Sequence, residues 1–98
     1  MFLAKVTGNV VSSQKDHRCH GMKLLLVQPH VTQGGRLVVS GSSIVAVDTV
    51  GAGEGALVLF TQGSSARLTD RTKDSPVDAV IIGIVDTVEM GGQKVPAP

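Results

Sequence analysis

Apolar residues along this chain either alternate with polar ones or form short runs between glycine, proline and polar residues. Residues 1–12 alternate between apolar and polar positions, with Phe2, Ala4 and Val6 on one face, which predicts a strand with one more polar face. Apolar, partly β-branched runs predict further strands at residues 22–28 (closed by Pro29), 37–39, 44–50, 56–61 and 78–88. The pattern therefore predicts an all-β protein.

The segments between these runs predict turns and one short helix. Residues 51–55 (GAGEG) hold three glycines in five positions, and residues 13–21 are polar, so loops are expected at both. Residues 63–70 (GSSARLTD) predict one or two helical turns with Ser64 as the N-cap. Five main strands with a short helix before the last favour a five-stranded OB-like barrel. We expect one domain at residues 1–90 and a Gly/Pro-rich, mobile or peripheral tail at 91–98.

Three of the predicted strands are apolar on both faces. In the last strand, Val80, Ile82 and Ile84 lie on one face, while Ala79 and Ile81 lie on the other. The outward residues of a lone small barrel should be polar, because water covers them. Either the helix and loops cover the outer faces, or neighbouring subunits do. One short helix is too small to cover three strands, so the pattern predicts self-association into a larger assembly.

Composition narrows the classes of partner. The chain has 98 residues, 42% hydrophobic and 17% charged, with a formal net charge of +1. No basic patch marks a surface for nucleic acid or membranes, and two phenylalanines supply few stacking platforms for bases. No apolar run approaches the ~20 residues of a membrane span, and Lys5 and Asn9 interrupt any signal-peptide core. With Cys19 as the single cysteine, we expect a soluble, cytoplasmic protein.

Three motifs suggest chemistry, and each has a structural explanation that fits better. Residues 51–56 match G-x-G-x-x-A, but a predicted strand follows where a dinucleotide site needs a helix. Residues 16–20 (DHRCH) gather metal-ligand types without the second pair that zinc sites use. Ser64 and Ser65 lack a nucleophile elbow, so helix capping is the expected role. We therefore expect no cofactor, no metal site and no catalytic residue.

Two carboxylates, Asp48 and Asp86, interrupt apolar strands. If they are buried, backbone N–H groups or a basic residue must satisfy them, within the chain or across a subunit boundary. Arg67 is the best candidate partner within the chain. Acid–base chemistry is less expected, because neither carboxylate has an evident partner acid or cleft.

Several stretches taken together resemble one family. In order they are FLAKVTGNVVSS, GMKLLLVQP, VAVDTVGAGEG, GSSARLT and PVDAVIIGIVDTV, spanning residues 2–88. Each stretch is a weak signal, but their ordered combination is specific, and it resembles the EutN/CcmL family of bacterial microcompartment vertex proteins. The resemblance implies an OB-like barrel that forms a homopentamer. Such pentamers fill the vertices of a polyhedral shell whose other tiles are hexameric shell proteins. The implied role is structural and geometric, so no enzyme activity is expected.

The resemblance also places residues in the expected ring. The segment around a narrow pore at the five-fold axis would be Gly63, Ser64, Ser65, Ala66 and Arg67. The subunit interface would include Asp48, Gly51, Gly53, Glu54, Ile82 and Ile84. The DHRCH loop at residues 16–20 is unusually rich in His and Cys for this family, which leaves a partner- or metal-related role open.

Two other classes of function compete with the shell role. One is an OB-like binding module for nucleic acid or a small ligand, which tight binding to a single-stranded oligonucleotide would favour. The other is a small enzyme that uses Asp48 or the His17 loop, which loss of an activity in Asp48→Asn with intact assembly would favour.

Overall fold

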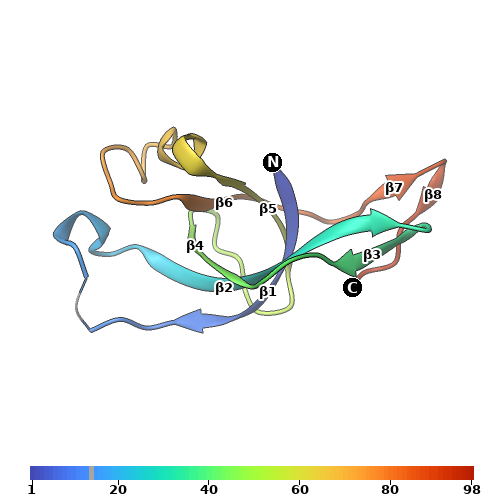
Figure 1. The fold of residues 1–98 in the computed structure, drawn as a ribbon, viewed down its shortest axis with the longest axis horizontal. Helices are drawn as coiled ribbons and strands as arrows, with labels where there is room; N and C mark the ends of the chain where they lie inside the picture. Colours follow the sequence, from blue (N-terminus) through green and yellow to red (C-terminus); the bar gives the residue numbers. More distant parts are fainter. Residues whose placement is uncertain (14) are drawn as a thin grey trace.

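A six-stranded sheet wraps into a barrel with two short 3-10 turns and one small hairpin (Figure 1). The computed structural model describes residues 1–13 and 15–98, so the loop predicted over 13–21 is described except at Gln14. The sheet contains β1 (Phe2–Val10), β2 (Lys23–Gln33), β3 (Arg36–Val39), β4 (Ile44–Asp48), β5 (Leu57–Gln62) and β6 (Ala79–Ile84). The remaining elements are the turns η1 (His17–Cys19) and η2 (Gly63–Arg67) and the hairpin strands β7 (Glu89–Met90) and β8 (Gln93–Lys94).

Five of these strands close the barrel. The hydrogen-bonded order is β1-β5-β6-β4-β2-β3, and an additional pairing of β1 with β2 joins the ends of the five-strand ring. All pairs in it are antiparallel except β4 with β6, where only Val47↔Val80 and Asp48↔Ile81 are in register. The predicted all-β, five-stranded OB-like barrel is confirmed. β3 extends beyond the ring as a hairpin with the far half of β2.

Alternate residues of the strands fill the barrel. In β1, Ala4 and Val6 are buried, and in β5, Val58 and Phe60 are buried, as the period-two pattern predicts. We call the set that they belong to the barrel core: Ala4, Val6, Leu25, Val27, Ala46, Ala52, Val58, Phe60, Ala79 and Ile81. Phe60 is the largest residue among them, and its ring lies against Phe2 with centroids 5.3 Å apart.

The predicted end of the second strand at Pro29 is wrong. β2 continues to Gln33 because it changes partners at this point: its pairing with β4 ends at Val27, and its pairing with β3 begins at His30. A proline removes one ladder donor, and that loss costs least between two partner strands. The carbonyl of Pro29 still accepts a hydrogen bond from the Ser40 amide, at 2.9 Å.

The predicted last strand over 78–88 is also too long. β6 ends at Ile84, which is opposite Val58 near the start of β5. The amide of Val85 still donates to Leu57 at 2.8 Å, and beyond it β5 has no further residue to pair with. The apolar sequence pattern therefore extends beyond the last residue of β6 that has a partner in β5.

The predicted helix over 63–70 is a shorter 3-10 turn. Its N-cap is Gln62, which makes no side-chain hydrogen bond, so the predicted capping role of Ser64 is wrong. Gly63 begins the turn at a φ of +68°, a conformation that favours glycine and does not continue into an α-helix.

At the C-terminal end of the chain, β7 and β8 pair as a hairpin around Gly91 and Gly92. Regular structure therefore continues past residue 90, where the tail was expected to begin.

The outer surface of the barrel is covered only in part by the chain itself. A second group of buried residues, the outer cluster, contains Met22, Val47, Ala66, Val77 and Val80. The turns η1 and η2 lie toward the same end of the long axis, and the hairpins β2–β3 and β7–β8 lie toward the other (Figure 1). Elsewhere large apolar side chains stay exposed, among them Phe2, Val31, Val39, Val45 and Ile84.

Truncating the largest residue of the barrel core should destabilise the fold strongly. Phe60 is 1% exposed, so Phe60→Ala should lower the free energy of unfolding by about 3–5 kcal/mol, through lost burial and a cavity. Urea denaturation at a fixed protomer concentration measures the change. The control is Val11→Ala at a site that is 93% exposed, which should change stability by less than about 0.5 kcal/mol. Equal losses in the two variants would contradict the assigned core.

Candidate functional site

The segment predicted to surround a pore forms an anchored turn. The Gly63 amide donates to the Asp78 carbonyl at 2.8 Å, which ties the start of η2 to the residue just before β6. The Arg67 guanidinium donates to the Val77 carbonyl at 3.3 Å. Four of the five predicted residues are exposed, and Ala66 is fully buried in the outer cluster. Within the subunit, Ala66 therefore anchors the turn and Ser64 and Ser65 present their side chains to solvent.

Asp48 organises the glycine loop that follows β4. One carboxylate oxygen accepts hydrogen bonds from the amides of Val50 and Gly51 at 3.0 and 3.1 Å, and the other accepts from Ala52 at 2.9 Å. The ammonium group of Lys23 lies 3.9 Å from the second oxygen. Of the two kinds of partner expected from sequence, backbone N–H groups supply most of the contacts. The suggested partner Arg67 is wrong, because it bonds to Val77.

The loop over 51–55 is fixed against the barrel at both ends. The Gly55 amide donates to the Val6 carbonyl at 2.8 Å, and the Val6 amide donates to Ala56 at 2.9 Å. Lys23 also donates to the Ala52 carbonyl at 3.1 Å. Gly51, Gly53 and Glu54 remain exposed at the surface of this loop, and a strand follows it, as the argument against a dinucleotide site expected.

The two isoleucines predicted at the interface differ in exposure. Ile82 is half-buried and packs against the outer cluster. Ile84 is 49% exposed at the end of β6. The structure therefore brings Ile82 close to η2 through the shared outer cluster, whereas Asp48 ends the neighbouring strand β4 and the 51–55 loop follows it.

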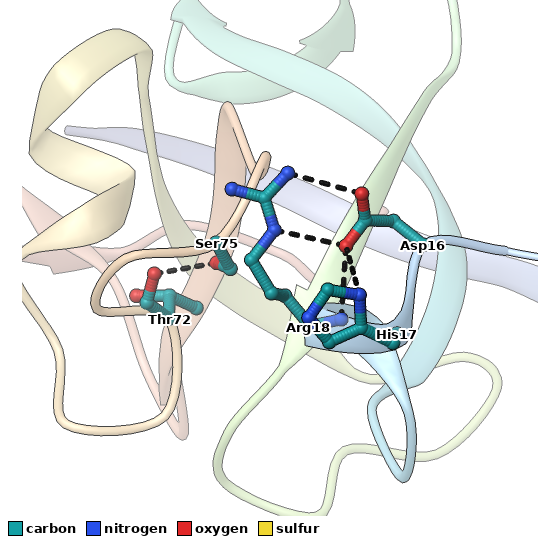
Figure 2. Close-up of polar contacts among 5 residues, drawn as sticks. All are labelled: Asp16, His17, Arg18, Thr72 and Ser75. Carbon is teal, nitrogen blue, oxygen red and sulfur yellow. Dashed lines mark hydrogen bonds and ion pairs between the residues drawn. The ribbon is translucent and has the colours of Figure 1, made fainter.

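The DHRCH segment forms the turn η1, which an ion pair closes (Figure 2). The Asp16 carboxylate accepts from the Arg18 side chain at 2.9 and 3.0 Å and from the Arg18 amide at 2.9 Å. These bonds hold the pKa of Asp16 well below its usual range. Cys19 is half-buried against the outer cluster. Among the residues that the structure describes, no three His, Cys, Asp or Glu side chains come together in a way that could hold a metal ion.

A buried polar network in the loop after η2 was missed by sequence reasoning. Thr72 is fully buried, and its hydroxyl lies 2.6 Å from that of Thr69. The Ser75 hydroxyl donates to the Thr72 carbonyl (Figure 2). Thr72 also donates to the Ala66 carbonyl of η2. The available signal was the spacing: Thr69, Thr72 and Ser75 recur every three residues, which places small hydroxyl side chains on one side of successive turns.

Comparison with known proteins identifies the family. The family model for the ethanolamine utilisation protein EutN and carboxysome proteins matches residues 1–86, which include the whole barrel. The chain belongs to the EutN/CcmL family. Two family relatives illustrate the match. The microcompartment shell vertex protein GrpN of Rhodospirillum rubrum is 48% identical, over 91% of this chain and 97% of the relative. PduN of Salmonella typhimurium, also named a microcompartment shell vertex protein, is 50% identical, over 90% of this chain and 98% of its own.

Solved structures of EutN/CcmL proteins share the fold. CcmL of Gloeobacter violaceus superposes with a TM-score of 0.88 at 40% identity, covering 99% of this chain and 97% of that chain. The pentameric microcompartment shell protein GrpN from Rhodospirillum rubrum superposes with a TM-score of 0.77 at 47% identity, covering 92% and 98%. Over the described part of this family member, no helix has the length and apolar character that crossing a membrane requires.

Replacing Asp48 should loosen the glycine loop. An amide at this position keeps one acceptor oxygen but turns an N–H₂ group toward backbone donors, so Asp48→Asn should cost about 2–3 kcal/mol of unfolding free energy. Urea denaturation measures the loss. Asp86→Asn, at an exposed carboxylate, is the matched control and should change stability by less than about 0.5 kcal/mol. If Asp48→Asn is as stable as this control, the three amide bonds do not hold the loop.

Proposed function

We propose that this chain is a structural subunit of a bacterial microcompartment shell, which forms homopentamers at the vertices. The observation that carries the proposal is the match over the whole barrel to GrpN, which is named a shell vertex protein and whose structure is pentameric. A closed polyhedron tiled by six-fold units needs five-fold units at its vertices. The function is then geometric, and the chain acts as a tile and not as an enzyme.

The outer surface of the subunit supports a ring. Five of the six strands of the sheet carry an exposed apolar side chain, namely Phe2, Val31, Val39, Val45 and Ile84. Exposure of apolar side chains to water is unfavourable, and burying them against a second subunit lowers the free energy of the assembly. A ring uses two different patches on each subunit, and it closes when the rotation between neighbours divides the circle evenly. Exposed apolar positions on several strands suit such head-to-tail contacts.

The interface of the proposed ring includes the 51–55 loop and the end of β6. Gly51, Gly53 and Glu54 are at the loop surface, where a neighbour can reach them, and Ile84 offers an exposed apolar side chain. Asp48 is buried, so it contributes by holding the loop in one shape. Ile82 is half-buried in the outer cluster and supports the same surface from within the subunit.

The turn η2 surrounds the proposed five-fold axis. Five copies of Ser64 and Ser65 then place a ring of hydroxyl groups at a narrow pore, because both side chains are exposed. Ala66 faces the outer cluster and Arg67 is tied to Val77, so these two residues set the turn and do not project freely. The partners of the pentamer in the shell are hexameric shell proteins, which meet it at the vertex.

Native mass spectrometry tests the ring directly. We expect one dominant species at five times the subunit mass. Ile84→Asp should weaken subunit association at least about a hundredfold, because it places a charge where an apolar contact forms. Ile84 is half exposed in the subunit, so the variant should still fold, whereas Ile82→Asp would also disturb the outer cluster.

Val11→Asp is the control for that experiment. Val11 is almost fully exposed in the loop after β1, so its aspartate variant should remain pentameric. A wild-type chain that is monomeric at micromolar concentration would contradict the proposal. It would favour the OB-like binding module, although Phe60 is buried and only the half-exposed ring of Phe2 is left for bases.

Thiol cross-linking tests the position of η2 in the ring. In a Cys19→Ser background, Ser64→Cys should react with a short bismaleimide to give a covalent ladder of up to five chains, because five copies meet at the axis. Lys73→Cys is the control, since Lys73 is exposed in the same loop but outside η2, and it should give no ladder. A pentamer in which Ser64→Cys gives no ladder would show that η2 does not surround the axis.

A further inference from the structure

The segment that carries η2 is a closed loop with its own internal bracing. β5 and β6 pair up to Gln62↔Ala79, and the Gly63 amide bonds to Asp78 just beyond that pair. The 14 residues between Gly63 and Asp78 therefore leave the barrel and return through one narrow neck. Compact loops with close ends keep their shape through their own side chains. The chain must supply such contacts inside this segment.

Thr72 makes the central contacts of that bracing. Its side chain is fully buried, and its hydroxyl donates to the Ala66 carbonyl in η2 and meets the Thr69 hydroxyl at 2.6 Å. Its amide donates to the Thr69 hydroxyl at 3.1 Å and to the Thr69 carbonyl at 3.2 Å. Its carbonyl accepts from the side chain and from the amide of Ser75. Thr72 thus links the turn η2, through Ala66, to Thr69 and Ser75 in the rest of the loop.

The bond to Ala66 adds a polar contact to the apolar anchor of η2. The Ala66 methyl group packs in the outer cluster with Met22, Val77 and Val80, which fixes the turn toward the barrel. The Ala66 carbonyl lies near the end of a 3-10 turn, where carbonyl groups lack partners within the turn. The Thr72 hydroxyl supplies that partner in a place that water does not reach.

We propose that Thr72 is a positioning residue that holds η2 in one pose, and so gives the pore of the pentamer a fixed width. The inference rests on the proposed function for the location of the pore, but not for the bracing itself. A turn held at its start by Asp78, in the middle by Thr72 and at its end by Val77 has no free hinge. The ring of Ser64 and Ser65 hydroxyl groups is then a rigid aperture and not a gate that opens and closes.

Amide hydrogen exchange on the assembled wild-type and variant proteins tests the bracing. Thr72→Val keeps the shape of the side chain and removes the hydroxyl, which leaves the Ala66 carbonyl buried without a partner. The reporters are the amides of Gly63 and Leu68, which bond to Asp78 and Ser65. Both should exchange at least about tenfold faster in Thr72→Val, because one buried hydrogen bond no longer opposes local opening.

Two controls separate positioning from general stability. Thr72→Ser keeps the hydroxyl and should leave the exchange of Gly63 and Leu68 within about threefold of wild type, a rescue expected only if the hydroxyl acts. The amide of Val6 in β1 bonds to Ala56 just before β5, far along the chain from η2, and its exchange should be the same in all three proteins. Equal acceleration at Val6, Gly63 and Leu68 would reduce Thr72 to a general stabilising residue and overturn the proposal.

Cross-linkers of different length test the fixed aperture. In the Cys19→Ser, Ser64→Cys pentamer, a rigid turn should react efficiently with one spacer length and poorly with shorter and longer ones. Adding Thr72→Val should broaden this dependence, and adding Thr72→Ser should not. A broad dependence already present with Thr72 intact would contradict a rigid aperture.

Failure of the proposed function gives a different result. A chain that is not pentameric would yield no ladder with any spacer, whereas the exchange rates of Gly63 and Leu68 would still respond to Thr72→Val. A pentamer in which Thr72→Val changes neither exchange nor spacer dependence would overturn only the role of Thr72.

Discussion

Pairing of β1 on both of its edges is the constraint on which the rest of the structure depends. β1 bonds to β5 through Phe2 to Lys5 and to β2 from Leu3 to Val10, so one strand closes the ring. The pairing with β2 shifts register between Val6 and Gly8, which bends the strand as a small barrel needs. With the ring closed, Ala4 and Val6 of β1 line the core beside Val58 and Phe60 of the adjacent strand β5. Four of the ten residues of the barrel core are alanines. Small residues are needed because the interior is narrow.

Closure leaves the chain with an unequal outer surface. Toward one end, the segments that contain η1 and η2 bury Val47 and Val80 on the outside of β4 and β6. The same strands stay apolar and exposed at Val45 and Ile84. The sequence left two ways to bury the outer faces of the strands, by loops of the same chain or by neighbouring subunits. Each of them therefore applies to a different part of the outer surface of the barrel. The loops supply the first part, and the proposed ring supplies the second.

The sequence predicted the barrel better than the loops, and the reason is physical. The period-two pattern of residues in β1 and β5 predicts which side chains are buried, because each side chain points either into the barrel or out of it. The end of β6 and the passage of β2 through Pro29 depend on which strand lies alongside, and a linear pattern does not contain that information. At the candidate site, the position of Gly63 to Arg67 at a five-fold axis stays a prediction, and the structure shows only that they form a 3-10 turn. The wrong cap at Ser64 and the missed role of Thr72 both came from contacts between residues within a tight loop, where backbone conformation and not hydropathy decides.

The position of β3 at the end of the sheet has a consequence for how the subunit must be produced. Over the described chain, β3 pairs with β2 alone, so its other edge offers free backbone donors and acceptors. Val39 on this strand is also well exposed. An open apolar edge is a template for pairing with any extended chain, including other nascent copies. A cell that makes this subunit in excess of its assembly partners therefore risks aggregation, and balanced expression with the rest of the assembly protects against it.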